Sequence, residues 1–256
     1  MSESRPARPL IFAANWKMQV TPAEARAFAE HFRAATQPVA GRMLWFFPPS
    51  VSLEATARAF AARGDVRVGA QDVHWEPKGA YTGATSVPLA AGAGAVGALV
   101  GHSERRHVFG ETDVETGRKV QALLGAGLTA MLCVGEKLVE REAGETETVC
   151  LRQLRAGLAG IAADGWARIV IAYEPVWVIG TGKNATPQDA ATVHRAIRAE
   201  LANLGAPGRV PVLYGGSVNL GNVAALLAED QVDGVLVGGA SLDPTGWATI
   251  VAGGVA

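Results

Sequence analysis

Short apolar runs alternate with longer amphipathic segments along the whole chain. The runs start near Leu10, Met43, Arg67, Ala98, Thr129, Ile169, Val212 and Gly234. Each of the first seven is followed by residues with helical spacing, as in Pro22–Ala34 and Gln188–Leu204, and Trp247–Val251 supplies the last such segment. Alternation of buried strands with amphipathic helices is typical of parallel α/β folds. The pattern therefore predicts eight βα units.

Capping residues mark the ends of several predicted helices. Thr21–Glu24 and Thr186–Asp189 each combine an N-cap threonine, a proline at the first helical position and an acidic residue three positions after the cap. Gly92–Gly94 and Gly125–Gly127 end helices just before the next strand. Eight units favour a closed (β/α)8 barrel, an α/β fold in which residues 10–256 form a single domain. An open doubly wound sheet is the alternative.

Composition and charge narrow the class of protein. The 256 residues are 49% hydrophobic, which suits one large core. The net charge is −1, and the Lys and Arg residues are scattered along the chain. We therefore expect no nucleic-acid partner and no membrane partner. Residues 1–9 have no apolar run and are predicted to form a flexible N-terminal tail, not a signal peptide. Two cysteines in a chain of this length indicate a reducing compartment, so we expect a cytoplasmic protein.

Polar residues that could take part in catalysis follow the predicted strands. Glu174 comes after the apolar run Ile169–Ala172 and precedes a proline, so it lies where a strand emerges. His102 follows the fourth strand close to a predicted helix start, and the positive end of that helix would keep its ring neutral. Lys17 follows the first strand and would supply a fixed positive charge for an anionic substrate. A carboxylate, an imidazole and an ammonium group at one barrel mouth suit proton transfer.

The residues after Glu174 have the composition of a closing loop. They combine a rigid Pro-Val-Trp start, an apolar tip and two glycines. A loop of this kind can exclude water from a neighbouring carboxylate, and a carboxylate that loses water becomes a better base. The predicted lid consists of Val176, Trp177, Val178, Ile179, Gly180, Thr181, Gly182 and Lys183.

Paired glycines follow the last two strands, in Tyr214–Ser217 and Val237–Ser241. Their backbone N–H groups can approach a ligand closely, and these two loops commonly form the phosphate site of such barrels.

Other sequence patterns that could indicate a site do not have the structural context that the site would need. The glycine pattern of Gly92–Gly97 precedes a strand when a dinucleotide site would need it to follow one, and the five histidines show no metal-ligand spacing. Cys133 lacks a nearby base and is expected to be a core residue.

Taken together, these segments resemble the triosephosphate isomerase family. The resemblance rests on Asn15–Met18, Gly69–Asp72, Gly101–Gly110, Gly135–Lys137, Tyr173–Trp177, Ile179–Lys183, Tyr214–Val218 and Val237–Leu242, which occur in the family's order. It implies an isomerase that interconverts dihydroxyacetone phosphate and D-glyceraldehyde 3-phosphate through an enediol or enediolate, without a cofactor or metal, in glycolysis and gluconeogenesis.

The same resemblance implies a role for each site residue. Glu174 is the base, His102 the electrophile and proton carrier, and Lys17 with Asn15 stabilises developing negative charge, while Glu104 supports Lys17. The phosphate is expected to be bound by backbone N–H groups of Gly180, Ser217, Gly238 and Gly239. Val178 and Asn184 depart from the family's usual residues and bear on the motion of the lid.

Family members are typically homodimers, in which a loop of one subunit completes the partner's site. Here that loop resembles residues 71–86, with Gln71 at its start and Thr82 at its tip. Two other functions stay open: a different phosphate-binding isomerase barrel, which would need a larger mouth, and a barrel without catalysis that serves as a binding protein. The presence of Lys17, His102 and Glu174 together favours the enzyme.

Overall fold

The computed structural model describes residues 9–178 and 185–253. Most of the predicted tail of residues 1–9 therefore lies outside the described residues. Eight strands start within one residue of the predicted positions. They are β1 (Leu10–Asn15), β2 (Arg42–Phe47), β3 (Val66–Val68), β4 (Gly97–Val100), β5 (Thr129–Val134), β6 (Ile169–Tyr173), β7 (Val212–Tyr214) and β8 (Gly234–Val237).

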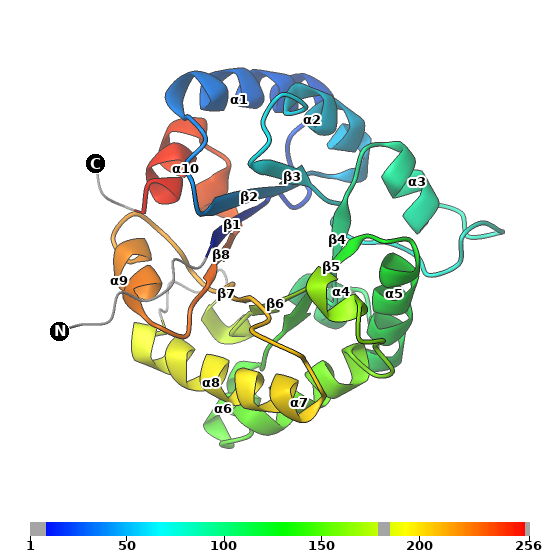
Figure 1. Cartoon of the computed structure of the whole chain (residues 1–256), viewed down its shortest axis with the longest axis vertical. Coiled ribbons are helices and arrows are strands. Elements are labelled where there is room, and N and C mark those ends of the chain that lie inside the picture. The colour runs from blue at the N-terminus through cyan, green and yellow to red at the C-terminus, as the bar shows by residue number, and fades with distance from the viewer. Residues whose placement is uncertain (1–8, 179–184, 254–256) are drawn as a thin grey trace.

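All paired strands are parallel and follow the order β3-β2-β1-β8-β7-β6-β5-β4. The two end strands meet just beyond β3, where the N–H of Ala70 donates to Gly97 O at 3.0 Å and the N–H of Leu99 donates to Ala70 O at 2.9 Å. Figure 1 shows the resulting ring of strands inside a ring of helices. The prediction of a (β/α)8 barrel is thus confirmed, and the open sheet is excluded.

The helices follow the strands along the chain, and most of them surround the sheet on its outer face (Figure 1). They are α1 (Pro22–Ala35), α2 (Leu53–Ala59), α3 (Val87–Gly92), α4 (Ser103–Val108), α5 (Asp113–Gly125), α6 (Leu138–Glu142), α7 (Thr146–Gly157), α8 (Pro187–Asn203), α9 (Val223–Ala228) and α10 (Pro244–Val251). The predicted capping boxes of α1 and α8 form at Thr21 and Thr186. Among these helices of the described chain, none is long and apolar enough to cross a membrane.

The core has two layers. Ile11, Ala13 and Cys133 belong to the side chains that fill the inside of the barrel, and alternate residues such as Phe12 and Ala14 belong to the larger cluster between the sheet and the helices. This alternation explains the apolar runs, because a strand covered on both faces has no solvated side. All five residues of β6 are buried accordingly. Burial also raises the pKa of the Cys133 thiol, which fits its predicted role as a core residue.

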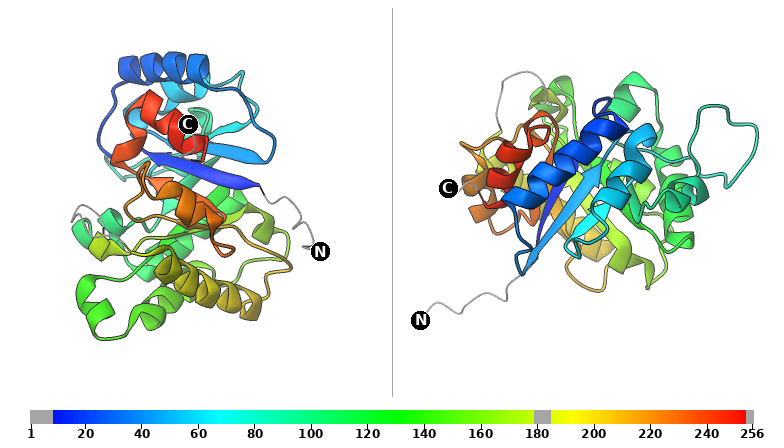
Figure 2. Two further views of the ribbon diagram at one scale, coloured as in Figure 1. Left: turned by 90° about the vertical axis from the view of Figure 1, so that its left-hand side faces the viewer. Right: turned by 90° about the horizontal axis from the view of Figure 1, so that it is seen from above.

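The segment between β3 and α3 starts on the barrel, where Ala70 and Val73 are buried, but its middle part projects from it. It extends away from the ring of helices, as the views of Figures 1 and 2 agree. Within it, the ring of His74 stacks on Trp75 with a centroid distance of 4.2 Å and contacts Tyr81 in a tilted arrangement at 4.1 Å. These ring contacts give the projecting loop an internal structure of its own. The loop is therefore ordered although the barrel does not cover it.

One buried histidine makes the stability of the fold sensitive to acid. His194 on α8 lies 3.0 Å from the carbonyl oxygen of Gln231, which accepts its Nδ1 proton. Its Nε2 has no hydrogen-bond partner among the described residues. Burial lowers the pKa of His194 to about 4. A second proton on this ring is therefore disfavoured in the folded chain.

This shift predicts a loss of stability below about pH 6.5, the usual pKa of histidine. Between that pH and about 4 the unfolded chain binds a proton that the folded chain refuses. The free energy of unfolding then falls by up to about 1.4 kcal/mol per pH unit. His194→Asn keeps a donor for Gln231 and should flatten this dependence in denaturant titrations run from pH 7 to 4. An unchanged slope would assign the acid sensitivity to other groups.

Candidate active site

The predicted catalytic residues meet at the carboxyl ends of the strands. This end of a (β/α)8 barrel is where active sites form, because every βα loop starts there. A cavity of about 330 Å³ opens at this end. Its lining includes seven of the residues singled out in the sequence: Asn15, Lys17, His102, Glu174, Ser217, Gly238 and Gly239. Glu104 lies beside the cavity and reaches it through Lys17.

Glu174 is buried and faces His102. Its Oε1 lies 3.0 Å from His102 Nε2, and its Oε2 accepts the backbone N–H of Ser103 at 2.9 Å. Burial alone would raise the pKa of Glu174, but the facing ring of His102 and the Ser103 amide outweigh burial and lower it. Burial thus acts in the expected direction, toward a more basic carboxylate, and the pairing with His102 acts against it. A substrate that separates the two side chains would weaken the interaction with His102, which is the main cause that lowers the pKa of Glu174.

Two glycines leave room for Glu174. A Cβ on Gly135 would overlap the backbone carbonyl oxygen of Glu174, and a Cβ on Gly215 would lie 2.8 Å from its Cγ. The backbone N–H of Glu174 also donates to Val134 O at 2.8 Å. The base is thus fixed between the ends of β5 and β7. Sequence reasoning treated Gly215 only as part of a phosphate loop, whereas the structure adds that it packs against the base.

His102 is the N-cap of α4, as its position near a helix start predicts. Its Nδ1 accepts the backbone N–H of Glu104 at 3.2 Å, so the proton of the neutral ring lies on Nε2, toward Glu174. Burial acts to lower the pKa of His102, but the carboxylate of Glu174 outweighs it and raises the pKa. The carboxylate of Glu174 therefore disfavours the neutral form of the ring that the sequence predicts. The sequence gives no sign of this, since the two residues lie far apart in it.

Lys17 is fixed at several atoms. Its backbone has the left-handed φ of 51°, which is uncommon for a residue other than glycine. Its N–H donates to Asn15 Oδ1 at 3.0 Å, its carbonyl oxygen accepts from Gln71 Nε2 at 2.7 Å, and its Nζ donates to Glu104 Oε1 at 2.6 Å. The ammonium group therefore has a defined place at the cavity wall. Gln71, predicted only as part of an interface loop, contributes to this geometry.

Three of the residues expected to bind the phosphate line the same cavity as the base. Ser217 follows β7, and Gly238 and Gly239 follow β8, where the chain enters a 3-10 turn (Gly239–Ser241). A Cβ on Gly238 would lie 3.1 Å from Lys17 Cε, while one on Gly239 would meet nothing within 4 Å. The first glycine thus makes room for the lysine and the second leaves its backbone open to the cavity. Gly180, the fourth expected contact, lies outside the described residues.

The start of the predicted lid is a 3-10 turn (Val176–Val178). The indole Nε1 of Trp177 donates to Glu136 Oε1 at 2.9 Å, and the hydroxyl of Tyr173 donates to the same oxygen at 3.1 Å. Arg141 lies 4.4 Å from the centre of the Trp177 ring. The remaining lid residues, 179–183, lie outside the described residues. Sequence reasoning missed the role of Glu136, although its position directly after β5 was a usable signal.

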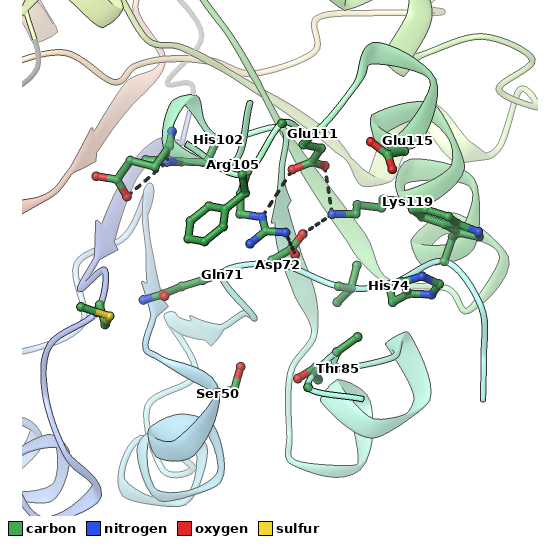
Figure 3. A pocket seen from close by; sticks show the side chains of 18 of the residues that line it. Ser50, Gln71, Asp72, His74, Thr85, His102, Arg105, Glu111, Glu115 and Lys119 are labelled. Atoms are coloured by element: carbon green, nitrogen blue, oxygen red, sulfur yellow. Dashed lines mark hydrogen bonds and ion pairs between the residues drawn. The ribbon is translucent and has the colours of Figure 1, made fainter. Parts of the chain in front are cut away.

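A second cavity of about 650 Å³ adjoins the first and shares Asn15, Lys17 and His102 with it. Figure 3 shows this groove, with His102 and Gln71 on one side and His74 and Thr85 on the other. The exposed side chains of Met18 and Phe109 also line it. The groove thus combines charged and apolar side chains, and it reaches the catalytic residues through Lys17 and His102.

Neither cavity presents the ligand set of a metal ion. Among residues 9–178 and 185–253, no group of three or more His, Cys, Asp or Glu side chains could hold a metal. The polar groups that line the smaller cavity include instead one carboxylate, one imidazole, one ammonium group, two side-chain amides, one hydroxyl and backbone amides. These groups can transfer protons and bind an anion.

Comparison with known proteins gives one family. The family model described as triosephosphate isomerase matches residues 10–253. The triosephosphate isomerase of Solibacter usitatus is 47% identical over 248 residues, covering 95% of this chain and 99% of that protein. Those of Roseiflexus sp. and Thermus thermophilus are each 46% identical, covering 95% and 92% of this chain and 97% and 95% of their own lengths. The chain belongs to the triosephosphate isomerase family and is an isomerase of triose phosphates.

Proposed function

We propose that Glu174, His102 and Lys17 carry out the interconversion of dihydroxyacetone phosphate and D-glyceraldehyde 3-phosphate through an enediolate. The observation that carries this proposal is the convergence of the three side chains on one cavity, with Glu174 Oε1 3.0 Å from His102 Nε2. Proton abstraction next to a carbonyl requires a base on the carbon and an electrophile on the oxygen. This pair supplies both, from the loops that follow β4 and β6.

The proposed reaction moves one proton between neighbouring carbons. Glu174 takes the proton from the carbon next to the carbonyl, and the electrons form the double bond of the enediolate. His102 donates its Nε2 proton to the carbonyl oxygen and recovers a proton from the neighbouring hydroxyl. Lys17 and Asn15 stabilise the negative charge on oxygen during these steps. Glu174 then returns its proton to the other carbon.

The loops after β7 and β8 are proposed to bind the phosphate. Ser217, Gly238 and Gly239 line the same cavity as the base, so a three-carbon substrate can reach both. The lid, including Gly180, is proposed to cover this cavity and exclude water. Exclusion of water protects the enediolate from losing its phosphate.

Turnover by the purified chain tests the proposal. The chain is expected to convert D-glyceraldehyde 3-phosphate into dihydroxyacetone phosphate with no added cofactor or metal, and inorganic phosphate should inhibit by competing for the loops after β7 and β8. Coupled spectrophotometric assays in both directions measure this conversion. A pure, folded chain with no turnover would refute the proposed roles.

We also propose that the protein is a homodimer in which the loop of residues 71–86 enters the groove of a second copy. Two observations support this. The loop projects from the barrel with its own ring contacts, and the groove is lined by the exposed side chains of Met18 and Phe109 next to Lys17 and His102. A second copy would cover these apolar groups.

We also propose a cytoplasmic location. Both cysteines, Cys133 and Cys150, are buried and free, which supports a reducing compartment.

Thr82→Arg tests the interface. Thr82 is exposed at the tip of the projecting loop, and the groove that would receive it is lined by cations and carboxylates that already pair with one another. Arginine adds bulk and a charge that must lose its water on binding, so it should weaken the dimer and lower the activity together, as seen by light scattering and by assays over a range of protein concentrations. Thr245→Arg, the same substitution on α10, is the control. Unchanged mass and full activity of the Thr82 variant would refute the proposed interface loop.

A further inference from the structure

A cluster of four charged side chains lies on the wall of the groove, next to the catalytic residues (Figure 3). It consists of Asp72, Arg105, Glu111 and Lys119, and we call it the charge cluster. Lys119 Nζ lies 2.5 Å from Asp72 Oδ1 and 3.0 Å from Glu111 Oε1. Arg105 lies 3.2 Å from Asp72 Oδ2 and 3.7 Å from Glu111 Oε2. Two carboxylates thus balance two cations.

The cluster joins two separate parts of the barrel. Arg105, Glu111 and Lys119 belong to α4, the α4–α5 connection and α5. Asp72 comes from the segment that follows β3, directly after Gln71. The side chains of Lys119 and Glu111 are only 5% and 3% exposed, so their charges interact with little screening. Loss of Asp72 would remove the cluster's link to the β3 side and leave a buried excess of positive charge.

Asp72 also closes a ring of contacts around Lys17. Gln71 Nε2 donates to the carbonyl oxygen of Lys17. The next residue, Asp72, pairs with Arg105, and the residue before Arg105, Glu104, accepts the Nζ proton of Lys17. Both the backbone and the ammonium group of Lys17 therefore depend on the pairing of Asp72 with Arg105. A lysine with φ of 51° needs such support, because its backbone conformation is unfavourable by itself.

We propose that Asp72 is a positioning residue that holds Lys17 in place relative to His102. The inference rests on the proposed function of Lys17 as the charge that stabilises the enediolate. Without the carboxylate of Asp72, Arg105 keeps its longer contact to Glu111 and its place over the Phe109 ring, and neither links it to the β3 side. The adjacent Glu104 and the Gln71–Asp72 segment then lose their common anchor. The ammonium group of Lys17 departs from the place where charge develops, and the barrier to proton transfer rises.

Asp72→Asn tests the proposal because it removes the charge and keeps the shape. We expect kcat to fall by about tenfold, a change of about 1.4 kcal/mol in the barrier, while KM changes less than twofold because the glycine loops are untouched. The matched control is Asp113→Asn. Asp113 pairs with Arg106, the neighbour of Arg105 on the same helix, at 2.7 Å but has no link to Lys17. This control should lose stability without loss of kcat.

A third variant separates positioning from general stability. In Asp72→Asn/Lys119→Met the excess positive charge is gone, so the melting temperature should recover toward that of the wild type. Because the ion pair between residue 72 and Arg105 is still absent, kcat should stay low. All variants are assayed over a range of protein concentrations, together with light scattering.

Three results would overturn the inference. The first is a wild-type kcat in Asp72→Asn. The second is recovery of kcat in the double variant. The third is recovery of kcat at high protein concentration, which would trace the loss to assembly. An inactive wild-type chain would instead refute the proposed function itself, so the two failures are distinguishable.

Discussion

Replacing Glu174 with glutamine is expected to lower kcat by at least about 100-fold, the low end for a positioned general base. Glutamine has the same shape and can still accept the Ser103 N–H, so the site should stay folded. It cannot take a proton from carbon at neutral pH. Steady-state assays in both directions should therefore show the loss in kcat, with KM changed much less.

The same variant provides a second measurement at His102. The carboxylate of Glu174 raises the pKa of His102 against the effect of burial. With a neutral side chain in its place, burial prevails, and the pKa of His102 should lie below its wild-type value in an NMR titration. Glu147→Gln, on the exposed start of α7, is the control for both measurements. Equal turnover in wild type and Glu174→Gln would leave the chain without its proposed base.

Replacing Gly135 with alanine is expected to cost about 3 kcal/mol of stability, the upper part of the range for overpacking, and most of the activity. The added methyl group would overlap the backbone carbonyl oxygen of Glu174, and backbone atoms cannot rotate away as a side chain can. The end of β6 must shift and takes the base with it. A misplacement of about 1 Å can lower the rate of a reaction about 100-fold.

Chemical denaturation and turnover together measure this effect. The control is Gly64→Ala, since a Cβ on Gly64 would meet nothing within 4 Å. That substitution should change stability by no more than about 0.5 kcal/mol and leave kcat intact. If Gly135→Ala kept both full stability and full activity, β6 would not be fixed against β5 in the way that the structure indicates.

The fold could be predicted from the sequence because its pattern is local. Strands buried on both faces appear as unbroken apolar runs, and so all eight starts were found within one residue. Helix starts were readable because Thr21 and Thr186 form caps with residues only three positions away. The residues at the barrel mouth followed from the same logic, since each comes directly after a strand.

What the sequence could not provide are contacts between elements that are distant along the chain. The direction of the Glu174 pKa depends on His102, and the place of Trp177 depends on Glu136. The pairing of Asp72 with Lys119 joins the loop after β3 to helix α5, which follows β4. Each of these residues alone is a common surface or core residue, and only the closed ring of strands brings it to its partner.

The close approach of Gly238 to Lys17 has a consequence for how this active site can evolve. A side chain at position 238 would press on the end of the lysine, which Glu104 already holds. A mutation that reshapes this loop for a different anion would therefore also disturb the lysine. Position 238 therefore affects both substrate preference and reaction rate, and we expect its sequence to change more slowly in evolution than the sequences of neighbouring loops.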